Sequence, residues 1–253
     1  MTNFLIELKQ RNETLYYFGV LCGIVAVVCL CLTQLTATQV YNVNAWYKPF
    51  KFAVSTMVYA WAMAWYVHYL PKYDATWFNW SITILLGLEI AYIALQAGRG
   101  QLSHYNASTP LYSIFFTLMG VAASAVAIYT AYIGVLFFKN DVAALPDHYL
   151  WAIRAGIFIF VVFAFQGFLM ATMQTHTIGG ADGGAGLPIT AWSTRFGDPR
   201  IAHFIGMHAL QVLPIVSFYA LKSLRLTFVA ILLYLFLAVF SLAQAIQGKP
   251  FFG

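Results

Sequence analysis

Charge is what this sequence has least of. Lys, Arg, Asp and Glu together make up 8% of its 253 residues, whereas a soluble globular domain carries roughly 25%. Hydrophobic residues make up 62%, and so few charges cannot cover a surface that faces water. The composition therefore excludes a water-soluble fold and indicates an integral membrane protein.

Cysteine is also scarce, and its placement excludes a disulfide framework. Cys22, Cys29 and Cys31 all fall within the first apolar run, and we expect them to be small buried residues. The thirteen Lys and Arg residues give a net charge of +5, but they stand singly between apolar runs. A nucleic-acid binder gathers its cations on one face, so nucleic acid is not expected as a partner.

Long apolar runs dominate what is present. A bilayer core about 30 Å thick is crossed by about 20 helical residues, because only a helix satisfies its own backbone hydrogen bonds in lipid. We therefore predict an all-α fold, a single transmembrane helical domain over residues 1–253 in contact with the lipid bilayer, with about seven membrane-spanning helices. The predicted helices cover residues 15–35, 51–70, 77–97, 110–138, 150–174, 201–221 and 226–246.

The loop charges favour a cytoplasmic N-terminus only weakly. That orientation places seven Lys and Arg residues inside and six outside, and the bias grows if the outer cations have functional roles. We expect the inner membrane of a bacterium. The inner cations are Lys9, Arg11, Lys72, Lys139, Arg154, Lys222 and Arg225, and the outer ones are Lys48, Lys51, Arg99, Arg195, Arg200 and Lys249.

The loops on the two sides differ more than their charges do. Those on the N-terminal side are short and plain, as in LPKYD and LKSLR. The opposite side has longer loops rich in amides, aromatics and histidines, and long loops in a compact bundle are usually functional or disordered. We expect function on this polar side, which carries QAGRGQLSHYNASTP and MQTHTIGGADGGAGLPITAWSTRFGDPR.

Four of the six histidines lie on or just inside the polar side. These are the candidate ligands of a metal or haem iron: His104, His176, His203 and His208. His203 and His208 are five residues apart, which separates them by about 140° around a helix, so they do not easily share one ligand face. Gln211 lies three residues after His208 and shares its face, which makes it a candidate cofactor contact.

The costliest residue is Glu89, near the middle of a predicted span. An ionisable group there costs about 2.5–3.5 kcal/mol on insertion scales, so it should face the bundle interior and is a candidate catalytic acid. Burial favours its neutral, protonated form. Gln96, seven residues on, returns to the same helix face and is a candidate cofactor contact.

Cations at the ends of the spans form the last candidate group. Arg99, Arg200 and Lys48 are predicted to bind an anionic group such as a haem propionate or a lipid head group, although cations at these positions also snorkel to head groups. Asp198 can pair with Arg200 or cap the helix that begins near Pro199.

Three functions follow from these residues. The first is a redox protein in which histidines bind haem b or a transition metal near the non-cytoplasmic leaflet and exchange electrons or protons with a quinone, another small apolar ligand or a lipid. The second is a metal-dependent enzyme acting on a lipid, which lacks an HExxH motif or a His pair at i, i+4. The third is a proton-coupled transporter or ligand sensor that uses Glu89.

Overall fold

The computed structural model describes residues 2–70, 72–140, 142 and 145–252. These residues form eight α-helices, one π-helical turn and one two-stranded hairpin, which confirms the all-α prediction. The elements are α1 (Thr2–Arg11), α2 (Glu13–Leu35), β1 (Gln39–Val40), β2 (Val43–Asn44), α3 (Tyr47–Val67), α4 (Thr76–Gly98), α5 (Pro110–Lys139), α6 (Asp147–Met173), α7 (Pro199–Val216), the π turn Ser217–Leu221 and α8 (Leu224–Ile246).

Six helices in the described part of the chain are long and apolar enough to cross a membrane, so the protein is a multi-pass membrane protein. They are α2, α4, α5, α6, α7 with its π turn, and α8. The predicted count of seven is approximate, because α3 has 21 residues but does not reach the same apolarity. Lys48 and Lys51 lie in its first two turns, which explains the difference.

The helices form two compact units. Unit 1 holds α1–α4, both strands and α5 up to Tyr129, and unit 2 holds the rest of α5 with α6, α7 and α8. The single domain expected over residues 1–253 stays a prediction.

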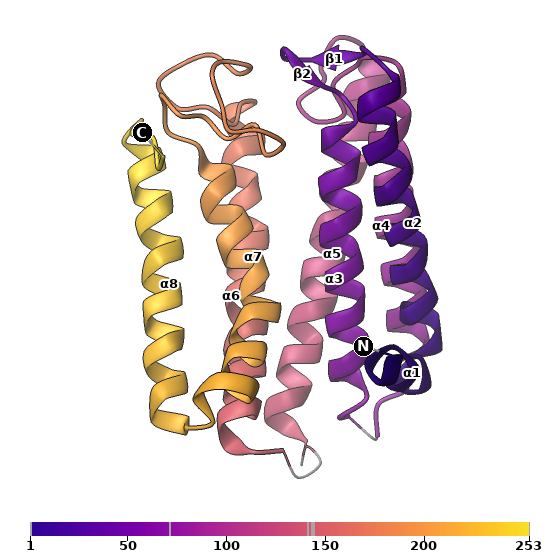
Figure 1. The fold of residues 1–253 in the computed structure, drawn as a ribbon, viewed down its shortest axis with the longest axis vertical. Coiled ribbons are helices and arrows are strands. Elements are labelled where there is room, and N and C mark those ends of the chain that lie inside the picture. Colours follow the sequence, from indigo (N-terminus) through magenta and orange to yellow (C-terminus); the bar gives the residue numbers. More distant parts are fainter. Residues whose placement is uncertain (1, 71, 141, 143–144, 253) are drawn as a thin grey trace. The chain divides into compact units, whose positions relative to one another are not determined.

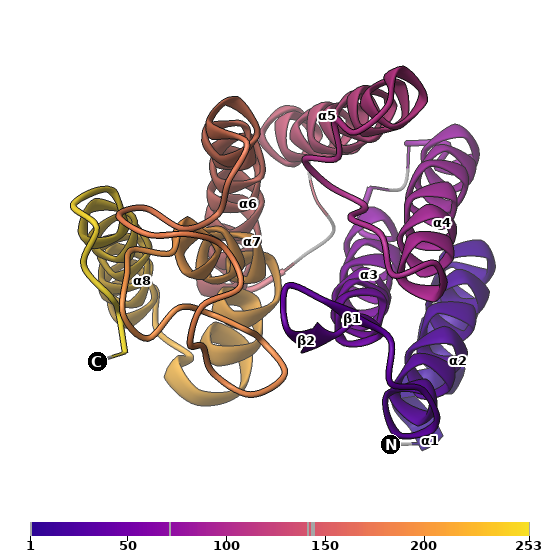
Figure 2. The ribbon, with the colours of Figure 1, turned by 90° about the horizontal axis from the view of Figure 1, so that it is seen from above.

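In unit 1, α2, α3 and α4 run side by side (Figures 1 and 2). Gly19 on α2 has no side chain to obstruct Trp61 of α3, whose indole donates a hydrogen bond to the Tyr16 carbonyl at 3.2 Å. At the start of α2, the side chain of Asn12 accepts a hydrogen bond from the Leu15 amide at 3.1 Å, which caps the helix. Its amide group also donates to Asn79 of α4 at 2.9 Å. These contacts fix the register of the three helices.

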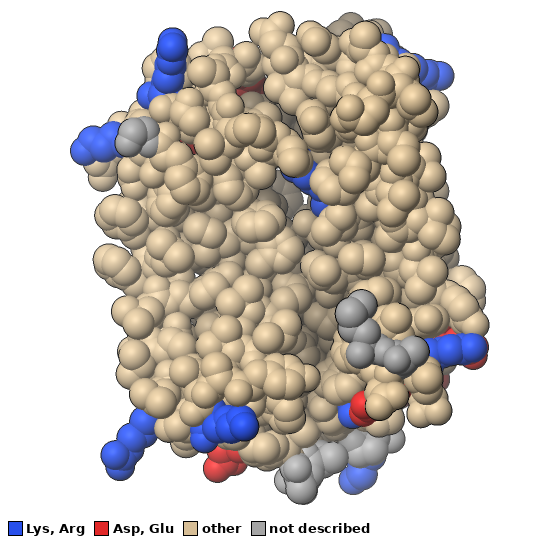
Figure 3. All heavy atoms as spheres, in the orientation of Figure 1, with Lys and Arg blue, Asp and Glu red and all other residues tan. Residues whose placement is uncertain are grey.

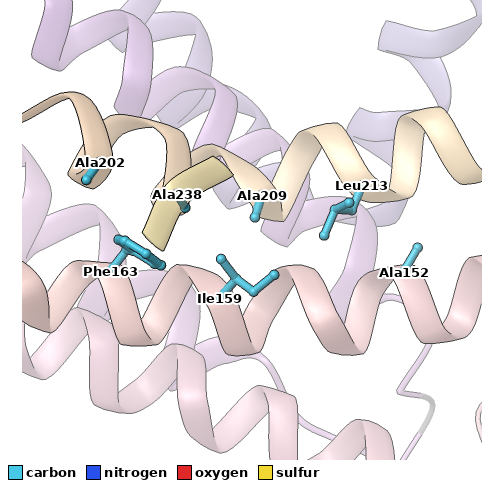
Figure 4. Close-up of a cluster of buried hydrophobic side chains, with 7 residues drawn as sticks. All are labelled: Ala152, Ile159, Phe163, Ala202, Ala209, Leu213 and Ala238. Atoms are coloured by element: carbon cyan, nitrogen blue, oxygen red, sulfur yellow. The ribbon is translucent and has the colours of Figure 1, made fainter. Parts of the chain in front are cut away.

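In unit 2, α6, α7 and α8 pack around small residues. A cluster of buried side chains joins the three helices (Figure 4), and it consists of Ala152, Ile159, Phe163, Ala202, Ala209, Leu213 and Ala238. Gly206 lets the Phe163 ring lie directly against α7, because a methyl group there would overlap the ring. Four of the seven members are alanine, so the helix backbones approach closely, as is common between membrane helices.

The space-filling view shows where the charged side chains lie. On the face drawn in Figure 3, most Lys, Arg, Asp and Glu side chains gather near the ends of the helices, and most of the middle is free of charge. Large exposed apolar side chains occupy the helix surfaces, among them Leu88, Phe158, Leu232 and Phe236, each more than 60% exposed. Contact with lipid acyl chains accounts for this exposure.

Candidate functional site

The first turn of α7 is set by Asp198. Its Oδ1 atom accepts a hydrogen bond from the Arg200 amide at 3.1 Å, and Pro199 occupies the first helical position. The same carboxylate binds the Arg200 guanidinium at 2.8 Å and 2.6 Å. Asp198 is 1% exposed, so this pair is a fixed part of the structure. Capping and pairing, the two roles expected for Asp198, both occur.

His203, one turn into α7, forms the most specific contact of the site. Its Nδ1 atom lies 2.7 Å from the carbonyl oxygen of Phe163 on α6. A carbonyl only accepts hydrogen bonds, so Nδ1 carries the proton and Nε2 keeps its lone pair in the neutral ring. In the described part of the chain, Nε2 has no hydrogen-bond partner.

Gly167 makes room for this imidazole. A Cβ atom at Gly167 would lie 3.1 Å from Cε1 of His203, closer than most real Cβ contacts, and 3.6 Å from Nδ1, an ordinary van der Waals distance. The absence of a side chain at this position therefore lets the ring reach the Phe163 carbonyl. Gly167 was not among the residues selected from the sequence, although a glycine inside an apolar helix is a signal of close approach.

His208 lies further along α7 on a different face. Its ring centroid is 4.3 Å from that of Phe204, and its side chain lies next to Gln211. His208 and His203 are close enough to act on each other electrostatically. His203, Phe204, His208 and Gln211 thus form a partly buried polar surface that extends about 140° around α7, from His203 to His208. We call this surface the α7 histidine face. The Oε1 atom of Gln211 is buried without a hydrogen-bond partner among the described residues.

Gln166 is the second unsatisfied amide of unit 2. Both its Oε1 and its Nε2 atoms are buried and lack a hydrogen-bond partner within the described residues. An unsatisfied polar atom in a buried position costs about 1–3 kcal/mol. Gln166 directly precedes Gly167, so the unsatisfied amide lies next to the α6 residue that accommodates His203.

His176 lies outside the helices, in the cap of unit 2, which we define as residues 174–198. Its Nδ1 atom is 3.1 Å from Asp182, whose carboxylate also accepts hydrogen bonds from the Thr175 hydroxyl at 2.8 Å and from the His176 amide. Asp182 was not predicted from the sequence. Its contacts with the first residues of the cap assign it a structural role.

In unit 1, Glu89 and Gln96 share the inner face of α4, as their spacing predicted. Gln96 is 1% exposed, and its amide donates to the Leu102 carbonyl at 3.1 Å, which fixes the loop after α4. Glu89 is partly buried, and its carboxyl makes no hydrogen bond within the described residues. The positive charge that acts on it is the ammonium of Lys48 at the start of α3.

His104 and Arg99 lie in the same unit, beyond the end of α4. The His104 ring packs against Phe52 and Phe116, with centroids 5.5 Å and 6.2 Å away, and its Nδ1 atom is 3.2 Å from the Ser103 hydroxyl. Arg99 is exposed. The candidate ligands are therefore divided, with His104 in unit 1 and the other three histidines in unit 2.

The described residues contain no group of three or more His, Cys, Asp or Glu side chains that could hold a metal ion. The comparisons with known proteins add no template, since the chain matches no protein-family model, no curated protein and no solved structure.

Proposed function

We propose that this chain is an integral membrane redox protein in which Nε2 of His203 ligates the iron of haem b. The observation that carries the proposal is the hydrogen bond from Nδ1 of His203 to the Phe163 carbonyl. Histidine ligands commonly donate their other ring N–H to a backbone carbonyl or a carboxylate, which fixes the tautomer and the ring orientation. His203 thus has the neutral tautomer and the supporting hydrogen bond that are typical of a histidine ligand.

Haem is favoured over a bare transition metal because of the number of protein ligands that each requires. A protein-bound zinc or iron ion takes three or four side chains, a set that the described residues lack. Haem iron takes one or two axial ligands from the protein. For the same reason, a metal-dependent enzyme that acts on a lipid is less well supported than a haem protein.

The surroundings of His203 support part of this assignment. Phe204 and the partly buried His208 offer an apolar ring surface and a second imidazole on the same helix. Arg200 does not suit a propionate, because its guanidinium is bound to Asp198 and to the Ala191 carbonyl. A quinone is the proposed exchange partner, and the bacterial inner membrane with a cytoplasmic N-terminus is the proposed setting.

Visible spectroscopy of the purified protein tests the proposal. We expect a Soret band in detergent that shifts on addition of dithionite, with iron in elemental analysis of the same sample. His203→Ala should lose both signals, whereas His148→Ala, at the start of α6, should keep them. A colourless and iron-free preparation would rule out the haem assignment, as would full occupancy in His203→Ala.

A second function, proton coupling at Glu89, has an observation of its own. A carboxyl on the inner face of a membrane helix, without a hydrogen bond among the described residues and in the field of Lys48, is expected to bind and release a proton. Infrared difference spectra recorded across a pH titration should show a carboxyl band that Glu89→Gln removes. The control is Glu13→Gln, since Glu13 is 66% exposed. An unchanged band in Glu89→Gln would exclude this role.

A further inference from the structure

The cap of unit 2 holds one aromatic residue, Trp192, in a defined position. Both residues that flank Trp192 are hydrogen-bonded to the ion pair of Asp198 and Arg200. Arg200 Nη2 donates to the Ala191 carbonyl at 2.5 Å, and the Ser193 amide donates to Asp198 Oδ2 at 2.9 Å. Since Asp198 and Arg200 are bound to each other at 2.6 Å, residues 191–193 are tied to the first turn of α7.

The Trp192 side chain connects the cap to the α7 histidine face through a ring contact with Phe204. Its ring centroid lies 5.3 Å from that of Phe204, in an edge-on arrangement, and Phe204 lies 4.3 Å from His208. On its other side, Trp192 is stacked with Phe252 at 6.2 Å. Edge-to-face and offset-stacked rings at these separations attract one another, so Trp192 is held between the chain end and α7.

A second set of contacts keeps the cap in place. The Leu187 amide donates to the Trp192 carbonyl at 2.8 Å, and Ile178 pairs with Gly197 through two backbone hydrogen bonds. Gly197 in turn lies so close to Ala245 of α8 that a Cβ atom would overlap the Ala245 carbonyl. The cap is thus a folded structure, and a local shift of Trp192 does not require the whole cap to unfold.

We propose that Trp192 is a gate at the polar end of the α7 histidine face, and that Asp198 and Arg200 are the positioning residues that hold it closed. The proposal rests on the proposed function only in taking that face as the ligand site. A water-soluble molecule that approaches His208 from the cap side then has to displace the indole. A ligand that enters from the lipid does not.

Thiol labelling measures this gate without any bound cofactor. In a full-length chain with Cys22, Cys29 and Cys31 replaced by alanine, Met207→Cys puts one thiol on α7 between His203 and His208. A charged, membrane-impermeant thiol reagent is then added to the folded protein in vesicles. We expect slow labelling in this background, and labelling at least about tenfold faster when Trp192→Ala is added.

The positioning residues are tested in the same assay. Arg200→Gln removes the charge-assisted hydrogen bond that holds the closed position, so labelling should also accelerate by about tenfold. Arg195→Gln is the matched control, because Arg195 is an exposed arginine of the same cap and should leave the rate unchanged. Trp192→Phe keeps an aromatic ring on Phe204 and should restore most of the protection.

Each outcome decides one part of the proposal. Equal labelling rates with and without Trp192→Ala would overturn the gate, and unchanged labelling in Arg200→Gln would overturn the positioning role. Thermal unfolding of each variant, with labelling done well below the midpoint, separates gating from a general loss of structure. If the gate opens as expected in a protein that proves colourless, the haem assignment fails while the gate stands.

Discussion

Nδ1 of His203 donates its proton to the main-chain carbonyl of Phe163, 2.7 Å away and on another helix. A bond between a side chain and a backbone oxygen survives most substitutions of the accepting residue. The hydrogen bond is more sensitive to the distance between α6 and α7, and Gly167 is the α6 residue that lies against the His203 ring. Substitution of Gly167 is therefore expected to disturb this hydrogen bond more than substitution of Phe163.

Gly167→Ala is expected to displace the His203 ring. The new methyl group would lie 3.1 Å from Cε1 and 3.6 Å from Nδ1, so the ring has to move by a few tenths of an ångström and the hydrogen bond lengthens. If His203 binds haem, disturbing the hydrogen bond that supports its ring is expected to lower the affinity for haem by roughly 10–100-fold. Titration of the purified protein with haem measures the loss.

Gly120→Ala is the matched control for Gly167→Ala. Among the described residues, no heavy atom outside the adjacent backbone of its own helix lies within 4 Å of a Cβ atom at Gly120 on α5, so the substitution adds no clash. It also favours the helix, by up to about 1 kcal/mol in water. Haem occupancy equal to that of wild type is expected, and a loss in both variants would show that helix flexibility and not the His203 contact is responsible.

Gly206→Ala is expected to destabilise unit 2 without touching His203 directly. A methyl group at Gly206 would overlap the Phe163 ring, which is 2% exposed and belongs to the buried cluster. Overpacking of this kind costs about 1–3 kcal/mol. The thermal unfolding midpoint in detergent should fall, and reducing the ring with Phe163→Leu in the same chain should recover part of the loss. A midpoint equal to that of wild type would contradict the close packing of α6 on α7.

The helices of this protein could be predicted from the sequence because lipid leaves few alternatives. Segments of about 20 apolar residues had to be helical, and the boundaries fell within a few residues of the observed ones. The main difference is the second predicted span, 51–70, which is observed as α3, Tyr47–Val67. Pro49 was compatible with a helix start because a proline is tolerated in the first turn.

The site was harder to predict because its partners are backbone atoms or glycines. Glu89 and Gln96 share a face, as their spacing predicted, since seven residues make about two turns. No pattern of side chains could indicate that His203 bonds the Phe163 carbonyl, because that contact depends on how α6 and α7 pack. Arg200 was expected to meet an anionic ligand, but its guanidinium binds Asp198 two residues away, a partner that the sequence had also indicated.

Arg154 is expected to contribute to the stability of unit 2 through the end of α5. Its Nε and Nη2 atoms donate to the Phe137 carbonyl at 3.1 Å and 2.7 Å, one of the last carbonyls of α5. A cation at this end also interacts favourably with the helix dipole. Arg154→Gln should lower the free energy of unfolding by about 1–3 kcal/mol, measured by chemical denaturation in detergent. Arg154→Lys should fall in between, and equal stability of all three proteins would exclude the role.

Asp74 gives a prediction about pH at the start of α4. Its Oδ1 atom accepts a hydrogen bond from the Thr76 amide at 3.0 Å, and the hydrogen bonds from the Thr76 side chain and backbone lower the pKa of the carboxyl below its usual value. The unfolded chain has the ordinary pKa of about 3.9. Since the folded pKa is the lower one, the stabilisation is complete above about pH 4 to 5 and is lost as the pH falls through the folded value.

Two substitutions separate the effect of this titration from the effect of the hydrogen bond to Thr76. Asp74→Ala removes the acceptor, so its unfolding midpoint should be below that of wild type at pH 7, and the two midpoints should converge as the pH is lowered. Asp74→Asn keeps an oxygen that can accept the hydrogen bond from the Thr76 amide but has no charge to titrate. Its midpoint should lie between those of wild type and Asp74→Ala at pH 7 and remain above that of Asp74→Ala at low pH. A gap between wild type and Asp74→Ala that does not change with pH would mean that the Asp74 carboxylate is not the group that titrates.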